Sequence, residues 1–219
     1  MTCDSGDISL MVDEIIREKP ESLFGIAHHL YVGGDENSAK SFNTNLRGIG
    51  TNYPDIEKWM TEYYRGDFMF TVQIIQNSLT IENLNSYIFW GGAWKGPVGK
   101  DMENLIGMDS GSNEEEWDHE HGYVIGEKYY SMRHFSEYIL PGYIRIGADV
   151  DLDTVKGVDR TKAGTDEVSC SAYVSPEKER MVLVAVNDLD VPQKYQFQMG
   201  SYKVSNSKVI LTNYENGEN

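Results

Sequence analysis

The residue in this sequence best placed to do chemistry is Glu62. It follows Trp59-Met60-Thr61, which has the pattern of an apolar strand, and Tyr63 and Tyr64 come directly after it. A carboxylate at the carboxyl end of a buried parallel strand points toward the mouth of the sheet, where α/β folds place ligand sites. An unpaired charge there is costly unless it serves a purpose, whereas most glutamates simply face solvent. The pattern therefore leaves a catalytic carboxylate and a surface residue as the two interpretations.

A second group of candidate functional residues is aromatic and runs from Tyr87 through Trp90 to Trp94. The two tryptophans flank the short tip Gly91-Gly92-Ala93. Rings at strand ends can act as flat platforms for the apolar faces of sugar rings, although large aromatic residues most often pack in a core. Two tryptophans beside a Gly-rich tip favour a binding loop slightly over a core.

Residues of the types that ligate metal ions cluster in two places, at His28-His29 and in the segment Asp118-His119-Glu120-His121. Adjacent residues on a strand point to opposite faces, so the two histidines cannot share a metal, and one of them can face the inside of the sheet. The second cluster lacks a third well-placed ligand and has the composition of a solvated loop. We expect no metal and no cofactor. Cys3 and Cys170 are too far apart in the sequence to form a metal spacing or a disulfide framework.

The charge balance excludes several partners. The 219 residues include 19 Lys and Arg against 35 Asp and Glu, a formal net charge of -16. Phosphate backbones and anionic lipid are bound by clustered basic residues, so nucleic acid and membrane surfaces are not expected partners. No apolar run approaches the length of a membrane span, and the polar start lacks the regions of a signal peptide.

The elements that must position these residues alternate in the first half of the chain. Hydrophobic periodicity predicts helices and strands in the order helix, strand, loop, strand, helix, strand, which is typical of βα units around a parallel sheet. The predicted ranges are a helix over 8–19 ending before Pro20, strands over 23–32, 57–64 and 84–90, and a helix over 67–84 capped by Asp67.

The second half changes character near residue 140. Residues 93–122 are predicted to be a long loop, and a helix over 127–140 is ended by Pro141-Gly142. Short alternating segments then predict an antiparallel sheet, in part of a β-sandwich, with strands at 143–146, 168–174, 180–187, 193–199 and 208–212. The expected division is residues 1–140 and residues 141–219.

Five ordered segments resemble glycoside hydrolase family 30, most closely its xylanase and glucuronoxylanase branch. They are GIAHHLYVGG (25–34), KWMTEYY (58–64), NSYIFW (85–90), YYSMRHFSEYILPGYIRIGA (129–148) and VSCSAYVSPEKERMVLVAVN (168–187). The resemblance implies α/β plus β architecture: residues 1–140 as the C-terminal portion of a (β/α)8 barrel, about strands six to eight, and residues 141–219 as an attached, incomplete β-sandwich.

The resemblance also implies a role for Glu62. Family members are retaining hydrolases, in which one carboxylate attacks the anomeric carbon and a second protonates the leaving oxygen. Glu62 matches the nucleophile, whereas the acid/base glutamate follows barrel strand four and is absent from this chain. The resemblance therefore implies the nucleophile-bearing half of a retaining endo-β-1,4-xylanase, secreted in the parent family. The alternative is an inactive fragment or a weak carbohydrate-binding protein.

Substrate contacts follow from the same placement. The residues expected at the sugar-binding face are His29, Tyr31, Tyr64, Trp90 and Trp94. Glucuronoxylanases hold a uronic acid branch with an arginine and a tyrosine, and this chain has Trp94 and Gly96 at those positions, with Lys95 the nearby cation. Lysine lacks the bidentate fork of arginine, so plain xylan or a related β-linked glycan is the expected substrate. A missing N-terminal half, or self-association through open barrel edges, is the expected protein partner.

Overall fold

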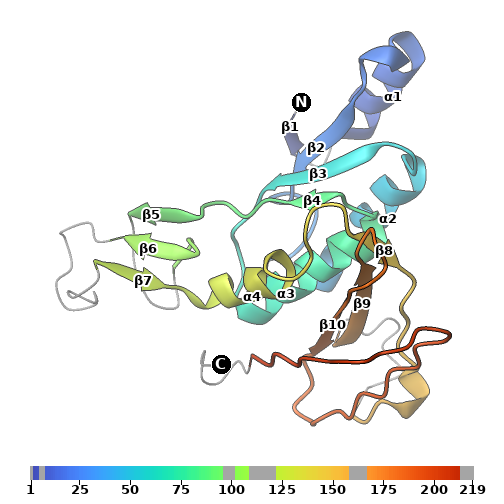
Figure 1. Ribbon diagram of the computed structural model, residues 1–219. Helices are drawn as coiled ribbons and strands as arrows, with labels where there is room; N and C mark the ends of the chain where they lie inside the picture. The colour runs from blue at the N-terminus through green and yellow to red at the C-terminus, as the bar shows by residue number, and fades with distance from the viewer. Residues whose placement is uncertain (1, 5–7, 96–101, 109–121, 158–166, 213–219) are drawn as a thin grey trace.

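The computed structural model describes residues 2–4, 8–95, 102–108, 122–157 and 167–212, and arranges them chiefly as sheet, helices and sheet (Figure 1). The first sheet has four parallel strands in the order β1-β2-β3-β4. These strands are β1 (Thr2–Asp4), β2 (Gly25–His29), β3 (Glu57–Glu62) and β4 (Ser86–Tyr87). The predicted strands at 23–32, 57–64 and 84–90 are thus confirmed as parallel neighbours, although each is shorter than predicted.

Segment 85–90 follows β3 further than the two residues of β4 suggest. The amide groups of Asn85, Ile88 and Trp90 donate to the carbonyls of Lys58, Met60 and Tyr63, at 2.9, 2.8 and 3.2 Å. These bonds bring the chain at Trp90 next to the residue that follows Glu62.

Helices α2 and α3 cover one face of this sheet. The helical elements are α1 (Ile8–Glu18), η1 (Pro20–Ser22), η2 (Ala39–Phe42), α2 (Asn43–Asn52), α3 (Phe68–Asn77), η3 (Ser78–Glu82), α4 (Glu127–Ser136) and η4 (Leu152–Thr154). Helix α1 stops before Pro20 as predicted. The predicted cap of α3 is also confirmed, because the Asp67 carboxylate accepts a hydrogen bond of 2.8 Å from the Phe70 amide.

Helix α3 is apolar on two sides because it packs between two sheets. Toward the parallel sheet, Phe70 and Ile74 join Met60 in one core cluster. On its other side, Phe68, Val72 and Ile75 pack with residues of α4 and of the second sheet. A helix in this position needs no polar face, which explains the nearly continuous apolar run in its sequence.

The second sheet is antiparallel, as predicted, in the order β10-β9-β8. Its strands are β8 (Ile144–Ile146), β9 (Val168–Val174) and β10 (Met181–Asn187). The strands predicted at 193–199 and 208–212 are wrong, because neither segment joins a backbone ladder. The Tyr195 hydroxyl instead donates to the Val186 carbonyl at 2.9 Å, so a side chain rather than a strand pairing holds this part of the chain.

Two predicted loops contain regular structure. The segment between the first two strands forms η2 and α2, although NTNLRGIGTN has weak helix formers, because Leu46 is completely buried in the core. Within 93–122, β5 (Ala93–Lys95) pairs with β6 (Ile106–Met108), which pairs in turn with β7 (Tyr123–Ile125) in a separate sheet. Three-residue strands are too short for hydrophobic periodicity to reveal.

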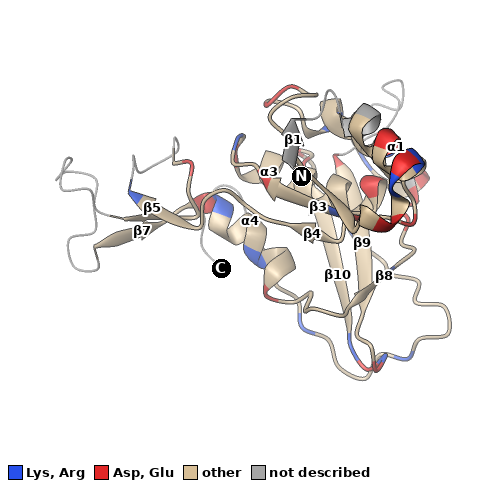
Figure 2. Ribbon diagram, turned by 90° about the horizontal axis from the view of Figure 1, so that it is seen from above, with Lys and Arg blue, Asp and Glu red and all other residues tan. Residues whose placement is uncertain are grey.

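Charged residues of both signs lie along α1 (Figure 2). Arg17 is within 3.9 Å of Glu14 and 3.2 Å of Glu18, and all three side chains are exposed. The buried side of α1 contributes Val12 to a small cluster with Ile26 and Tyr53. Among the helices that the structure describes, none is both long and apolar enough to cross a bilayer.

Candidate active site

The two faces of the parallel sheet differ in what covers them. On β2, the side chains of Ile26 and His28 are buried against the helices, whereas Gly25, Ala27 and His29 are only partly buried on the other face. Trp59 of β3 lies over Gly25 on this second face, since a Cβ at Gly25 would come within 2.5 Å of the indole. We call this second face the open face.

An irregularity in the ladder brings Glu62 onto the open face. Met60 pairs with His28, but the next pair joins His29 to Glu62, so Thr61 is an extra residue in β3. Simple alternation along β3 would have placed Glu62 on the same, helix-covered face as Met60. The bulge reverses this, because paired residues of neighbouring strands share a face, and it directs the carboxylate toward His29.

Glu62 and His29 form a contact at this edge of the sheet. The Glu62 Oε2 atom is 3.7 Å from the His29 Nε2 atom, and the side chains are 29% and 21% exposed. Both groups are therefore accessible to a ligand and partly shielded from water. Two predicted site residues, from neighbouring strands, are brought together.

Tyr31 completes this group and joins it to Tyr64. Its ring lies 6.0 Å from the His29 ring and 5.6 Å from the Tyr64 ring, both in edge-to-face geometry. Burial, and then the nearby Glu62 carboxylate, raise the pKa of the Tyr31 phenol above its ordinary value. Its hydroxyl is buried, so a protonated donor is held beside Glu62.

A cationic side chain, Arg65, also lies beside Tyr31, and the sequence analysis did not identify it as a site residue. The Arg65 guanidinium is 5.4 Å from the centre of the Tyr31 ring and forms an ion pair of 3.1 Å with Glu36. Burial opposes the charge of Arg65, but the nearby Tyr64, Glu36 and Tyr63 together outweigh it and raise the pKa of the guanidinium. Arg65 was visible in the sequence three residues after Glu62, but nothing in the spacing indicated a stacked cation.

The two predicted tryptophans lie in different places. Trp90 is 52% exposed and is bonded through its backbone to Tyr63, next to Glu62. Trp94 is 64% exposed and belongs to β5, in the small sheet that extends away from the body of the molecule (Figure 1). Lys95 follows it on the same strand and is also exposed. The geometry brings Trp90, but not Trp94, to the surroundings of Glu62.

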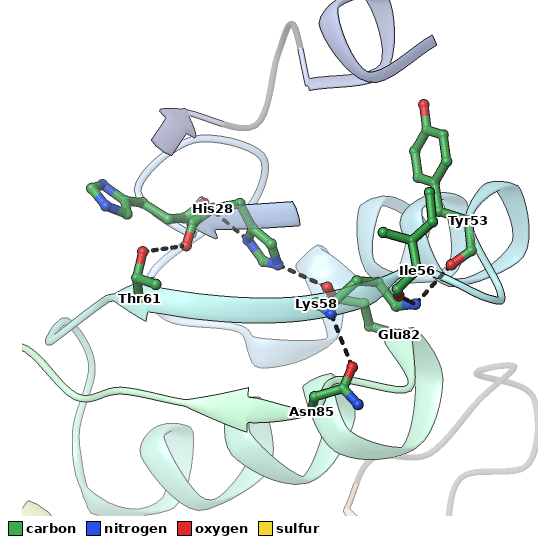
Figure 3. A network of polar contacts seen from close by, with 8 residues as sticks. His28, Tyr53, Ile56, Lys58, Thr61, Glu82 and Asn85 are labelled. Atoms are coloured by element: carbon green, nitrogen blue, oxygen red, sulfur yellow. Dashed lines mark hydrogen bonds and ion pairs between the residues drawn. The ribbon is translucent and has the colours of Figure 1, made fainter. Parts of the chain in front are cut away.

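A buried polar network lies on the opposite, helix-covered face (Figure 3). The His28 Nε2 atom is 2.8 Å from the Glu82 Oε1 atom, with both side chains completely buried. The Lys58 ammonium donates to the carbonyls of Tyr53 and Ile56, and burial lowers its pKa despite the nearby Glu82 and Asp55. A lysine inside the apolar segment KWMTE was the available signal for this network, and the sequence analysis did not use it.

The metal-like segment 118–121 lies outside the described residues. In the part of the chain that the structure describes, no three His, Cys, Asp or Glu residues gather closely enough to hold a metal ion. Burial raises the pKa of the Cys170 thiol, which disfavours the reactive thiolate form.

No protein-family model matches the chain, and no curated protein matches it either. Solved structures do match. SrfJ from Salmonella typhimurium aligns over 84% of this chain and 38% of its own, with a TM-score of 0.59 and 15% identity. A glycoside hydrolase family 30 endoxylanase from Clostridium papyrosolvens aligns over 82% and 38%, with a TM-score of 0.53 and 24% identity. The catalytic domain of a family 30 xylanase C from Talaromyces cellulolyticus aligns over 80% and 35%, with a TM-score of 0.52 and 14% identity.

These similarities concern the fold. The chain has a fold similar to part of each of these structures, two of which are family 30 xylanases, and it spans less than two fifths of the length of all three.

Proposed function

We propose that this chain carries the nucleophile-bearing half of a retaining endo-β-1,4-xylanase, with Glu62 as the nucleophile. The observation that carries the proposal is the bulge in β3, which places the Glu62 carboxylate on the open face, 3.7 Å from His29. The similarity in fold to two xylanases supports a substrate of the xylan kind. The proposed (β/α)8 arrangement assigns β2, β3 and β4 to barrel strands six, seven and eight.

The chemistry of the proposed step uses one carboxylate oxygen. Glu62 attacks the anomeric carbon of the sugar, the bond to the leaving oxygen breaks with its electron pair, and an ester joins the sugar to Glu62. Tyr31 and Tyr64 supply donors and apolar surface beside the reacting carbon, and Trp90 supplies an exposed ring for a neighbouring sugar. Protonation of an ordinary leaving oxygen needs an acid/base carboxyl group that this proposal assigns to a missing N-terminal half.

A substrate with a good leaving group removes that need and allows a direct test. We expect 2,4-dinitrophenyl 2-deoxy-2-fluoro-β-xylobioside to label the chain, because dinitrophenolate departs without protonation and the fluorine slows hydrolysis of the ester. Mass spectrometry of peptides should locate the added disaccharide on Glu62, and Glu62→Gln should abolish labelling. Absence of labelling in the wild-type chain, even with an added N-terminal half, would refute the proposal.

A second candidate function is carbohydrate binding without catalysis. The exposed indoles of Trp90 and Trp94 favour it, because large exposed aromatic rings are typical of sugar-binding surfaces. This candidate predicts retention on insoluble xylan that is lost in Trp90→Ala, with no covalent label on Glu62. Either function acts on an extracellular plant polysaccharide, so we extend the proposal to secretion of the parent protein.

A further inference from the structure

The contact between His28 and Glu82 is the most deeply buried pair of ionisable groups that the structure describes. Both side chains have no solvent exposure, and one carboxylate oxygen lies 2.8 Å from the imidazole. The second oxygen, Oε2, is buried without a hydrogen-bond partner among the described residues. Burying such a pair costs about as much as it returns, so stability alone is a weak reason for its presence.

The position of His28 connects this pair to the bulge. His28 is the last residue of β2 before the ladder changes register, and its own backbone carbonyl accepts a bond of 3.3 Å from the Thr61 hydroxyl. Thr61 is the extra residue of the bulge. The other imidazole nitrogen, Nδ1, is 3.5 Å from the carbonyl of His29.

The imidazole therefore lies between a closely packed element and the point where the ladder is interrupted. Glu82 ends η3, which packs closely against α2, since a Cβ at Gly50 would come within 2.8 Å of the Glu82 carbonyl. At the bulge, by contrast, the extra residue leaves the ladder locally incomplete. Figure 3 shows the chain of contacts from Glu82 through His28 to Thr61.

We infer that His28 and Glu82 form a positioning pair that fixes the β3 bulge and thereby the direction of the Glu62 carboxylate. The pair touches neither Glu62 nor a substrate, and it acts through Thr61 and His29. The effect on catalysis rests on the proposed function, but the effect on the structure does not. Without the pair, we expect the bulge to open while α3 stays intact.

Amide hydrogen exchange, followed residue by residue by NMR, tests the structural content on the full chain. In Glu82→Leu we expect exchange at residues 28–31 and 60–63 to accelerate at least about tenfold, and exchange in α3 to change less than about threefold. Glu82→Gln keeps an acceptor for the imidazole and should restore protection at the bulge. If Glu82→Leu does not fold, His28→Asn, whose side chain is too short to reach Glu82, gives the same comparison.

A matched control is Ser171→Ala, because the Ser171 hydroxyl donates to Gln76 in another buried pair, 2.8 Å long, between β9 and α3. This variant should leave the bulge protected. Equal acceleration of the bulge and of α3 in Glu82→Leu, or no acceleration at either, would overturn the inference.

Labelling kinetics test the catalytic consequence. With the fluoroxylobioside, Glu82→Leu should lower the maximal labelling rate at least about tenfold, because small displacements of a nucleophile are costly. The inhibitor concentration at half-maximal rate should change less than about threefold, and Glu82→Gln should recover the rate. A loss confined to binding would contradict the inference. If the wild-type chain is not labelled even with an added N-terminal half, the proposed function fails, whereas the exchange measurement still decides whether the pair fixes the bulge.

Discussion

Lys58 shows how much a single residue can determine in this fold. Its side chain is 1% exposed, and its ammonium donates at 2.8 Å to the Tyr53 carbonyl and at 2.7 Å to the Ile56 carbonyl. These bonds hold the turn that leads from α2 into β3. The residue is therefore needed for the start of the strand whose other end carries Glu62.

We predict that Lys58→Met lowers the free energy of unfolding by about 1–3 kcal/mol. The methionine fills the space, but the Ile56 carbonyl loses its bond from the ammonium and the Tyr53 carbonyl keeps only the 3.4 Å bond from the Ile56 amide. Denaturant unfolding measures this difference. Lys95→Met is the control, since Lys95 is exposed on β5 and its removal should be nearly neutral. An equal effect of the two substitutions would show that the buried bonds of Lys58 contribute nothing.

The sequence made Glu62 a candidate, but it could not give the direction of the side chain. A carboxylate at the end of an apolar strand left both a catalytic carboxylate and a surface residue possible. Strict alternation would have turned it toward the helices, and only the pairing of His29 with Glu62, which skips Thr61, reveals the bulge. The partner of His28 was equally hidden, because Glu82 is 54 residues away in the chain.

At the scale of the elements, α2 was missed because its own sequence favours a loop. Its two glycines now serve different purposes. A Cβ at Gly50 would lie 2.8 Å from the carbonyls of Ile81 and Glu82, whereas a Cβ at Gly48 would meet nothing within 4 Å. Close packing of α2 on η3 thus depends on Gly50 and not on Gly48, which propensity alone cannot distinguish.

We predict opposite effects of alanine at these two positions. Gly50→Ala should destabilise the protein by about 1–3 kcal/mol, since backbone must move to admit the methyl group. Gly48→Ala should stabilise it by about 0.5–1 kcal/mol, because alanine restricts the unfolded chain and favours the helix. Thermal unfolding of both variants under the same conditions checks the signs, and two changes of the same sign would contradict the packing argument.

The start of α3 could be predicted correctly because its signal is local. Asp67 precedes the apolar run and accepts a hydrogen bond from the amide of Phe70. We predict that Asp67→Ala costs about 1 kcal/mol, whereas Asp67→Ser, which keeps an oxygen acceptor, costs only a few tenths. Urea denaturation of the pair measures the difference. Equal losses in the two variants would mean that the cap does not stabilise the helix.

At the scale of the whole molecule, His134 joins the C-terminal segment to α4. Its Nε2 atom lies 2.8 Å from the Thr212 hydroxyl. Burial, followed by the nearby Arg133, lowers the pKa of His134 below its ordinary value of 6.5, while Glu137 opposes the shift. The folded protein therefore takes up a proton at this site less readily than the unfolded chain does.

Stability should consequently fall as the pH decreases. Below about pH 6.5 the unfolded chain binds more protons at this position, so the free energy of unfolding decreases until the folded site also titrates. We predict that His134→Gln, which can still bond to Thr212, reduces this loss between about pH 7.5 and about pH 5. Asp188, whose pKa burial raises, contributes with the opposite sign. If the free energy of unfolding falls equally with decreasing pH in the wild type and in the variant, His134 is not the source of the pH dependence.

The open face of the parallel sheet leaves apolar surface exposed to solvent. Phe24 is 80% exposed and stacks on Trp59 at 5.6 Å, and the outer edges of β1 and β4 pair with no other strand in the described part of the chain. Apolar surface and unpaired strand edges favour association, which the net charge of -16 opposes. At physiological salt, charges more than about 8 Å apart are largely screened, so the apolar contact should prevail.

We predict that the chain self-associates with increasing concentration and that Phe24→Lys weakens this association severalfold. Asn52→Lys is the matched control, because it adds the same charge at an exposed position near the end of α2. Light scattering over a series of protein concentrations gives the average mass of each variant. A monodisperse monomer at every concentration would contradict the prediction, and equal weakening by both substitutions would assign the effect to charge rather than to the apolar face.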